Sequence, residues 1–82
     1  MIKKKLERKI YITNKLGLHA RAAAKFVNAT SKCSSKVQVK KGKTSVDGTS
    51  ILGLMSLAAT NGTQISIQCN GVDAKKDLFA LT

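Results

Sequence analysis

The chain is organised around residues 17–26, which read Gly17-Leu18-His19-Ala20-Arg21-Ala22-Ala23-Ala24-Lys25-Phe26. A β-branched run precedes this stretch and an alanine-rich helical pattern begins directly after His19, so the single histidine lies where a strand gives way to a helix. The first N–H groups of a helix lack intrahelical partners and carry partial positive charge, which favours anions there. Arg21 adds a planar cationic fork suited to phosphate oxygens. The stretch therefore predicts a nucleophilic imidazole beside an anion-binding cradle.

A lone histidine at a helix start can also be an ordinary solvated residue beside the cap, and position alone does not separate the two interpretations. Three sequence blocks favour the functional one. The first, Gly17-Leu18-His19-Ala20-Arg21, resembles the active-site signature of the HPr phosphocarrier family of the bacterial phosphoenolpyruvate-dependent phosphotransferase system. Residues 49–58 resemble that family's second helix, and residues 61–74 resemble its last strand and the entry to its final helix. The blocks follow in the family's order over most of the chain from Ile10.

The resemblance implies a phosphocarrier rather than an enzyme, and it assigns roles to particular residues. His19 would accept a phosphoryl group on its Nδ1 atom from enzyme I and pass it to an enzyme IIA in sugar uptake. Arg21 matches the family arginine that supports the phosphoryl group. Ala22 stands where many members have proline, a departure that indicates a subtype. The family's nitrogen-related regulatory branch remains an alternative to sugar uptake.

Residues 47–50, Asp47-Gly48-Thr49-Ser50, form a helix-start signal because their side-chain oxygens can accept from free N–H groups. Ser50 aligns with the serine that a dedicated kinase phosphorylates in many family members, although an ordinary N-cap explains it equally well. A regulatory kinase or phosphorylase is therefore an expected further partner.

The helix predicted over residues 51–60 is apolar nearly all round. Ile51, Leu54 and Met55 suffice for a core stripe, so Leu52 should remain exposed close to Ser50. The resemblance agrees, because this part of the family's second helix contacts enzyme I and enzyme IIA. We expect the partner-binding surface to include Leu18, Ala20, Ile51, Leu52 and Met55.

Alternating polar and apolar residues predict strands over residues 8–13, 37–41, 44–47 and 63–69, and helical spacing predicts helices over residues 20–31, 51–60 and 73–81. Turn residues are expected at Asn14 and Gly17, at Asn61-Gly62 as the end of the second helix, and at Asn70-Gly71. Residues 1–7 form a basic, frayed lead. The order β-α-β-β-α-β-α predicts an α+β open-faced two-layer β-sandwich, a four-stranded antiparallel sheet with three helices on one face. The resemblance implies the same fold.

The length of 82 residues predicts one domain, residues 1–82. Nothing in the sequence approaches the roughly 18 consecutive apolar residues of a membrane span, and the start lacks the apolar core of a signal peptide, so we expect a cytoplasmic monomer without membrane insertion. Cys33 and Cys69 fit no metal-ligand or redox spacing and are expected to be reduced, partly buried thiols. We expect no metal and no cofactor.

The net charge of +11 predicts attraction to polyanions. A small nucleic-acid-binding domain is therefore an alternative from another functional class. Aromatic residues for base stacking are scarce and no RNA-binding signature appears, so we expect no nucleic-acid partner. The lysines at positions 40, 41 and 43 are expected on solvated faces, and Asp47 and Asp73 are expected to cap helices.

Overall fold

The computed structural model describes residues 4–13 and 15–82, so the turn expected at Asn14 and the first three residues of the lead lie outside it. Within those ranges the chain forms four strands and three helices in the predicted order. Their bounds are β1 (Lys4–Tyr11), α1 (Ala20–Thr30), β2 (Lys36–Lys41), β3 (Thr44–Asp47), α2 (Ile51–Ser56), β4 (Gln64–Gly71) and α3 (Ala74–Leu81).

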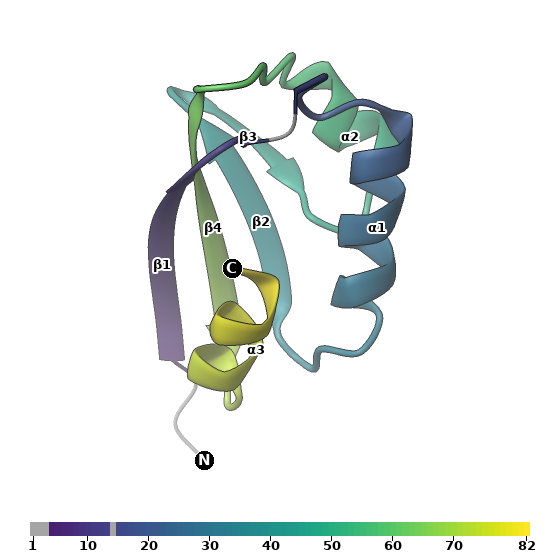
Figure 1. The fold of residues 1–82 in the computed structure, drawn as a ribbon. Helices are drawn as coiled ribbons and strands as arrows, with labels where there is room; N and C mark the ends of the chain where they lie inside the picture. The colour runs from purple at the N-terminus through teal and green to yellow at the C-terminus, as the bar shows by residue number, and fades with distance from the viewer. Residues whose placement is uncertain (1–3, 14) are drawn as a thin grey trace.

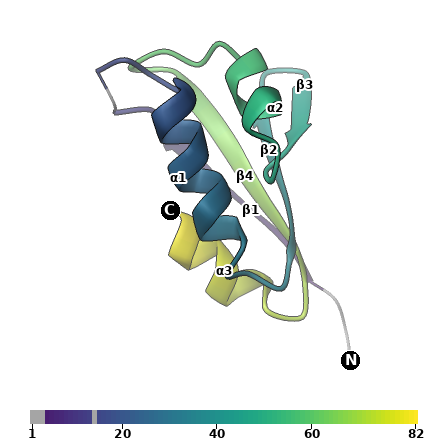
Figure 2. The same ribbon diagram turned by 90° about the vertical axis from the view of Figure 1, so that its right-hand side faces the viewer.

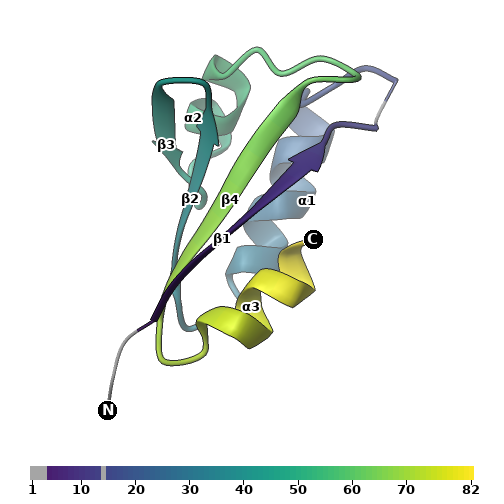
Figure 3. The same ribbon diagram turned by 90° about the vertical axis from the view of Figure 1, so that its left-hand side faces the viewer.

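The strands form one antiparallel sheet in the order β1-β4-β2-β3 (Figure 1). The helices lie over one face of this sheet, as Figure 2 shows from the helical side. Figure 3 shows the opposite face, which no described helix covers. The predicted open-faced sandwich is confirmed. The core lies between the two layers, where alternate strand residues meet small and branched side chains of the helices: Val37, Val39, Ile65, Ile67, Cys69, Ala23, Leu54, Leu57 and Leu78 are all buried.

The N-terminal lead was predicted wrongly for its last four residues. Residues 4–7 belong to β1, where Lys4 pairs with Gly71 and Glu7 pairs with Gln68. The same pairing carries β4 through Asn70 and Gly71, where a turn was expected. Local turn propensity was overridden because both residues complete the ladder between two neighbouring strands. Residues 4–7 of the predicted lead therefore belong to an edge strand of the sheet.

Helix α2 ends earlier than predicted, at Ser56 rather than near residue 60. Leu57 is its C-cap, and Ala58 follows in a left-handed backbone conformation (φ 51°) that ends the helix. The Nζ of Lys41 donates to the carbonyl oxygens of Leu57 at 3.0 Å and Ala58 at 3.4 Å. Lys41 was expected on a solvated face, but it is half-buried and stabilises the carbonyl end of this helix.

Two aspartates expected to be helix caps have other contacts. Asp47 accepts from the N–H and hydroxyl of Thr49, which lowers its carboxyl pKa and holds the turn before α2. Asp73 occupies the N-cap position of α3 without a side-chain capping bond, because its carboxylate accepts from the hydroxyl of Ser34 at 2.9 Å. The thiols of Cys33, half-buried, and Cys69, buried, are free as predicted. Burial raises the pKa of Cys69 to about 11.

Candidate functional site

His19 is the N-cap of α1, with an extended backbone (φ −84°, ψ 179°) directly before the first helical turn. Its Nδ1 accepts a hydrogen bond from the backbone N–H of Arg21 at 3.2 Å. Its carbonyl oxygen accepts the first helical bond, from Ala23 at 2.9 Å. Because Nδ1 accepts, its lone pair points to the N-terminal end of the helix and is held there by the Arg21 N–H.

The start of α1 also keeps free donors. Across residues 4–13 and 15–82, the backbone N–H groups of Ala20 and Ala22 donate to no acceptor. These donors lie at the positive end of the helix dipole, on either side of the N–H that contacts Nδ1. An anion attached to or approaching Nδ1 would therefore meet unsatisfied N–H groups and partial positive charge. Ala22 contributes such a donor, which a proline at this position would lack.

The loop that presents His19 is fixed by the connection between α2 and β4. Gly17 has φ +70°, and a Cβ there would overlap the carbonyl oxygen of Ala59 and lie 2.9 Å from Thr60 Cα. The next residue, Leu18, donates its N–H to the same Ala59 carbonyl at 2.8 Å. Only glycine permits both the left-handed backbone and this close approach. The position of His19 thus depends on a contact about forty residues away in the chain.

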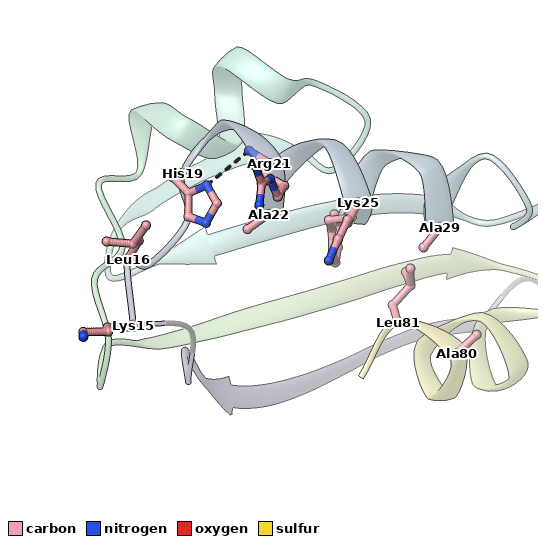
Figure 4. A pocket seen from close by; sticks show the side chains of 10 residues that line it. Lys15, Leu16, His19, Arg21, Ala22, Lys25, Ala29, Ala80 and Leu81 are labelled. Carbon is pink, nitrogen blue, oxygen red and sulfur yellow. Dashed lines mark hydrogen bonds between the residues drawn. The ribbon is translucent and has the colours of Figure 1, made fainter.

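A groove runs from His19 along α1 toward the end of α3 (Figure 4). Its charged lining consists of Lys15, Arg21 and Lys25, and none of the described residues that line it carries a carboxylate. The rest of the lining is apolar or small: Leu16, Ala22, Phe26, Ala29, Ala80 and Leu81. Cationic side chains along the groove that contains His19 favour an anionic substrate.

The structure brings the predicted partner residues close to this site only in part. Helix α2 packs against α1, and the segment that follows α2 contacts the loop before α1 through the hydrogen bond from the Leu18 N–H to the Ala59 carbonyl, so the end of α2 lies beside the start of α1. On α2, Leu52 is 79% exposed, Ile51 39% and Met55 40%. The exposure of Leu52 and the burial of Leu54 were predicted correctly. Ile51 and Met55 were wrongly expected to join Leu54 in the core stripe, where Leu57 is buried instead. Ala20 is exposed beside His19, whereas Leu18 is half-buried and packs against the core.

Ser50 is the N-cap of α2, as one of the two interpretations expected. Its Oγ accepts from the Gly53 N–H at 3.0 Å, and the residue is half-buried. Ser50 lies directly before the exposed strip of α2, which is formed by Ile51, Leu52 and Met55. A phosphate on this oxygen would therefore stand at the start of α2 and beside an apolar surface.

Three contributors to the site were not identified from the sequence. Lys15 and Leu16 precede the signature, and Leu16 is 76% exposed beside His19. Lys25 lies one helical turn beyond Arg21 and lines the same groove. The i, i+4 spacing of Arg21 and Lys25 was a usable signal, because residues four apart share a helix face. No local signal indicated Leu16.

Neither a metal centre nor a membrane span is apparent in the part of the chain that the structure describes. Residues 4–13 and 15–82 contain no cluster of histidine, cysteine, aspartate or glutamate side chains suited to a metal ion. Among the same residues, every helix is too short or too polar to cross a bilayer.

The fold and the site together define a small open-faced α+β sandwich that presents one imidazole at the start of its first helix. A family model described as "PTS HPr component phosphorylation site" matches residues 6–82, so the chain belongs to the HPr family of phosphotransferase-system phosphocarriers. It is 48% identical to phosphocarrier protein HPr of Neisseria meningitidis serogroup A over 77 residues, which cover 94% of this chain and 86% of that protein.

Two further relatives place the chain more broadly in the family. Phosphocarrier protein NPr of Shewanella violacea is 39% identical over 77 residues, covering 94% of this chain and 85% of that protein. The crystal structure of an HPr from Bacillus anthracis superposes with a TM-score of 0.88 at 35% identity, covering 94% of this chain and 92% of that one. The fold expected from the family resemblance is thereby confirmed.

Proposed function

We propose that this protein carries phosphoryl groups on Nδ1 of His19, received from phosphorylated enzyme I and delivered to an enzyme IIA during phosphoenolpyruvate-dependent sugar uptake. One observation carries the proposal: Nδ1 accepts a hydrogen bond from the Arg21 N–H at the start of α1. In this arrangement Nδ1 is the acceptor nitrogen of the imidazole and directs its lone pair at the helix start. Family membership supports the same assignment.

In the transfer step, the Nδ1 lone pair attacks phosphorus and forms the N–P bond. The bond between phosphorus and the donor's atom breaks at the same time, and its electron pair stays with the donor. The Arg21 N–H loses its acceptor as Nδ1 becomes bonded, and becomes a donor for a phosphoryl oxygen. Delivery to the acceptor reverses these events. The atoms and electrons of this step balance without water, a metal or a cofactor.

The charges around His19 fit a reversible carrier. The guanidinium of Arg21 and the ammonium groups of Lys15 and Lys25 line the groove and offset the charge of the phosphoryl group. Both the imidazole and the cations are open to solvent on one side, so a donor and an acceptor can approach the same face in turn. A carrier requires this openness, whereas a closed site would hold its phosphoryl group against transfer.

We assign the docking surface for enzyme I and enzyme IIA to the exposed strip of α2 together with the start of α1. Its residues are Leu18, Ala20, Ile51, Leu52 and Met55. An apolar centre beside cations is the composition of many transient interfaces with acidic proteins. We further propose that the carrier acts as a cytoplasmic monomer that presents this one surface to both partners in turn.

Ser50 is assigned a regulatory role on the same surface. A phosphate there would add negative charge next to Leu52 and weaken docking. Incubation with a serine kinase and ATP should label the parent protein and leave Ser50→Ala unlabelled. Equal labelling of both proteins would remove Ser50 from regulation and leave it as the N-cap of α2.

The nitrogen-related branch is a second candidate, favoured by the similarity to an NPr. We propose that each branch would supply the phosphoryl group through an enzyme I of its own. Initial transfer rates from a sugar-branch and a nitrogen-branch enzyme I, measured on the same protein, separate them. We expect the sugar-branch enzyme to be the faster donor.

The proposed acceptor is tested by incubation with enzyme I and phosphoenolpyruvate, followed by intact-mass spectrometry. The parent protein should gain the mass of one phosphoryl group that is lost in acid and retained in base. His19→Ala should gain none, while Ser50→Ala, the matched control, should be labelled like the parent. Labelling of His19→Ala would refute the assignment.

A further inference from the structure

A second groove lies between β1 and α3, on the side of α3 that faces away from α1. It shares no lining residue with the groove at His19. Helix α3 packs on β1 and β4 near the start of β1, whereas α1 begins at the opposite end of the molecule (Figure 3). Its apolar lining is Leu6, Val72, Leu78 and Phe79, and its charged lining is Lys4, Arg8, Lys75, Lys76 and Asp73.

The apolar part of this second groove is unusually exposed for so small a protein. Phe79 is 78% exposed and Val72 44%. Among the described lining residues, cations outnumber carboxylates by four to one, and the one carboxylate, Asp73, is engaged by the Ser34 hydroxyl. An exposed apolar patch with a cationic rim fits a ligand that offers apolar side chains together with negative charge.

The strand beside this groove also offers main-chain hydrogen bonds. Within residues 4–13 and 15–82, β1 pairs with β4 alone and is an edge of the sheet. The outward backbone groups of an edge strand can accept an additional extended segment. Lys5 and Lys9 line depressions on the open face of the sheet, while Leu6 and Arg8 line the groove. An added strand would thus place alternate side chains against the groove and beside the lysines.

We propose that the β1–α3 groove binds an extended, acidic segment of a partner protein that carries apolar residues at alternate positions. This docking site goes beyond the phosphoryl transfer at His19. A second copy of the chain is disfavoured as the occupant because each copy has a net charge of +11. Nucleic acid is disfavoured because Phe79 is the one aromatic side chain in the described lining. A lipid surface would leave the edge of β1 without hydrogen-bond partners.

The proposal is tested by NMR titration of the full chain with a synthetic peptide in which valine and phenylalanine alternate with glutamate. The largest amide shifts should fall on Leu6, Val72 and Phe79, and His19 should not shift. A peptide with lysine in place of glutamate should not bind. A peptide with proline at alternate positions should also fail, because proline removes the N–H groups needed for strand addition.

Two variants locate the site. Phe79→Ser and the double variant Lys75→Glu/Lys76→Glu should each weaken peptide binding by about tenfold, the loss typical of a central anchor. Leu16→Ser, a matched exposed apolar residue beside His19, should bind normally. All three should keep the parent's melting temperature, and the first two should still accept a phosphoryl group.

The proposal is wrong if the peptide causes no shifts, if its shifts centre on His19, or if Phe79→Ser binds normally. It is also wrong if phosphatidylserine vesicles or a single-stranded oligonucleotide displace the peptide from this groove at equal ionic strength. Displacement by vesicles or by the oligonucleotide would show that the groove binds a lipid surface or a nucleic acid instead.

Discussion

Arg21 contacts the proposed phosphoryl acceptor in two separable ways. Its backbone N–H donates to His19 Nδ1, and its guanidinium lines the groove beside that atom. Arg21→Ala keeps the first interaction and removes the second. Loss of a charge-assisted contact to phosphate costs about 1.5–3 kcal/mol, so transfer should slow by roughly tenfold to a hundredfold.

This expectation is measured as the rate of phosphoryl transfer from enzyme I, with a thermal melt of each protein. Lys43→Ala is the matched control, since Lys43 is an exposed cation outside the groove. The melting temperature of Arg21→Ala should match the parent's, because its side chain is exposed. Unchanged transfer kinetics would exclude the guanidinium from the site.

Asp77 is a buried carboxylate whose charge should make stability depend on pH. Burial alone would raise its pKa, but hydrogen bonds from residues 33–35, including the Ser35 N–H at 2.9 Å, outweigh burial and hold the pKa below its ordinary value. A lowered folded-state pKa stabilises the fold above the unfolded pKa of about 3.9, and this stabilisation is lost as pH falls through the folded value.

Asp77→Asn should therefore reduce the free energy of unfolding at pH 7 by about 1.5–3 kcal/mol, the range for hydrogen bonds to charged groups. The difference from the parent should shrink as urea unfolding is repeated toward pH 3. A deficit that stays constant across this range would show that the charge of Asp77 does not contribute.

The loop before α1 should depend on the absence of a side chain at Gly17. Alanine there would have to adopt φ +70° and would overlap the Ala59 carbonyl. Gly62→Ala is a matched control, because Gly62 has φ +88° but open space around it. The free energy of unfolding of Gly62→Ala should fall only by the cost of a side chain on a left-handed backbone, about 1–2 kcal/mol.

The free energy of unfolding of Gly17→Ala should fall by more than that of the control. Phosphoryl transfer should also slow, because the displaced loop carries His19. Urea unfolding and transfer rates of the two variants provide the comparison. If both variants lost equal stability and transferred normally, the contact with Ala59 would not position His19.

The exposed strip of α2 is expected to serve docking rather than folding. Leu52→Glu should weaken affinity for enzyme I strongly, with a melting temperature close to the parent's, because Leu52 is largely in solvent. Leu54→Ala provides the contrast, since removal of a buried leucine side chain costs about 2–5 kcal/mol. A large fall in melting temperature for Leu52→Glu, with normal transfer by the folded fraction, would contradict this role.

The elements that were predictable are those whose hydrophobic pattern agrees with their surroundings. The bounds of β3 were predicted correctly, and α1 differs by one residue at its end. The end of α2 was not predictable, because Ala58 adopts a positive φ without glycine and the carbonyl end is held by Lys41, a residue of another element. Residues 4–7 likewise acquire their structure by pairing with residues 68–71, and no local pattern contains this long-range pairing.

At the scale of the whole molecule, one part of the site could be predicted from the sequence and another part could not. His19 was located because strand and helix patterns meet at that residue, and family resemblance added its chemistry. The groove around His19 was not predictable, because its lining comes from three separate segments, residues 15–16, 19–29 and 80–81, that meet only after folding. The same holds for the groove between β1 and α3, whose lining comes from the two ends of the chain.

The central claim is that Nδ1 of His19 is the atom that bears the phosphoryl group. The most direct measurement is NMR of ¹⁵N-labelled protein after phosphorylation by enzyme I and phosphoenolpyruvate, which observes the coupling between phosphorus and each imidazole nitrogen. We predict coupling to Nδ1 and loss of the hydrogen bond from the Arg21 N–H to that atom. Coupling to Nε2, or phosphorus on any residue other than His19, would contradict the account.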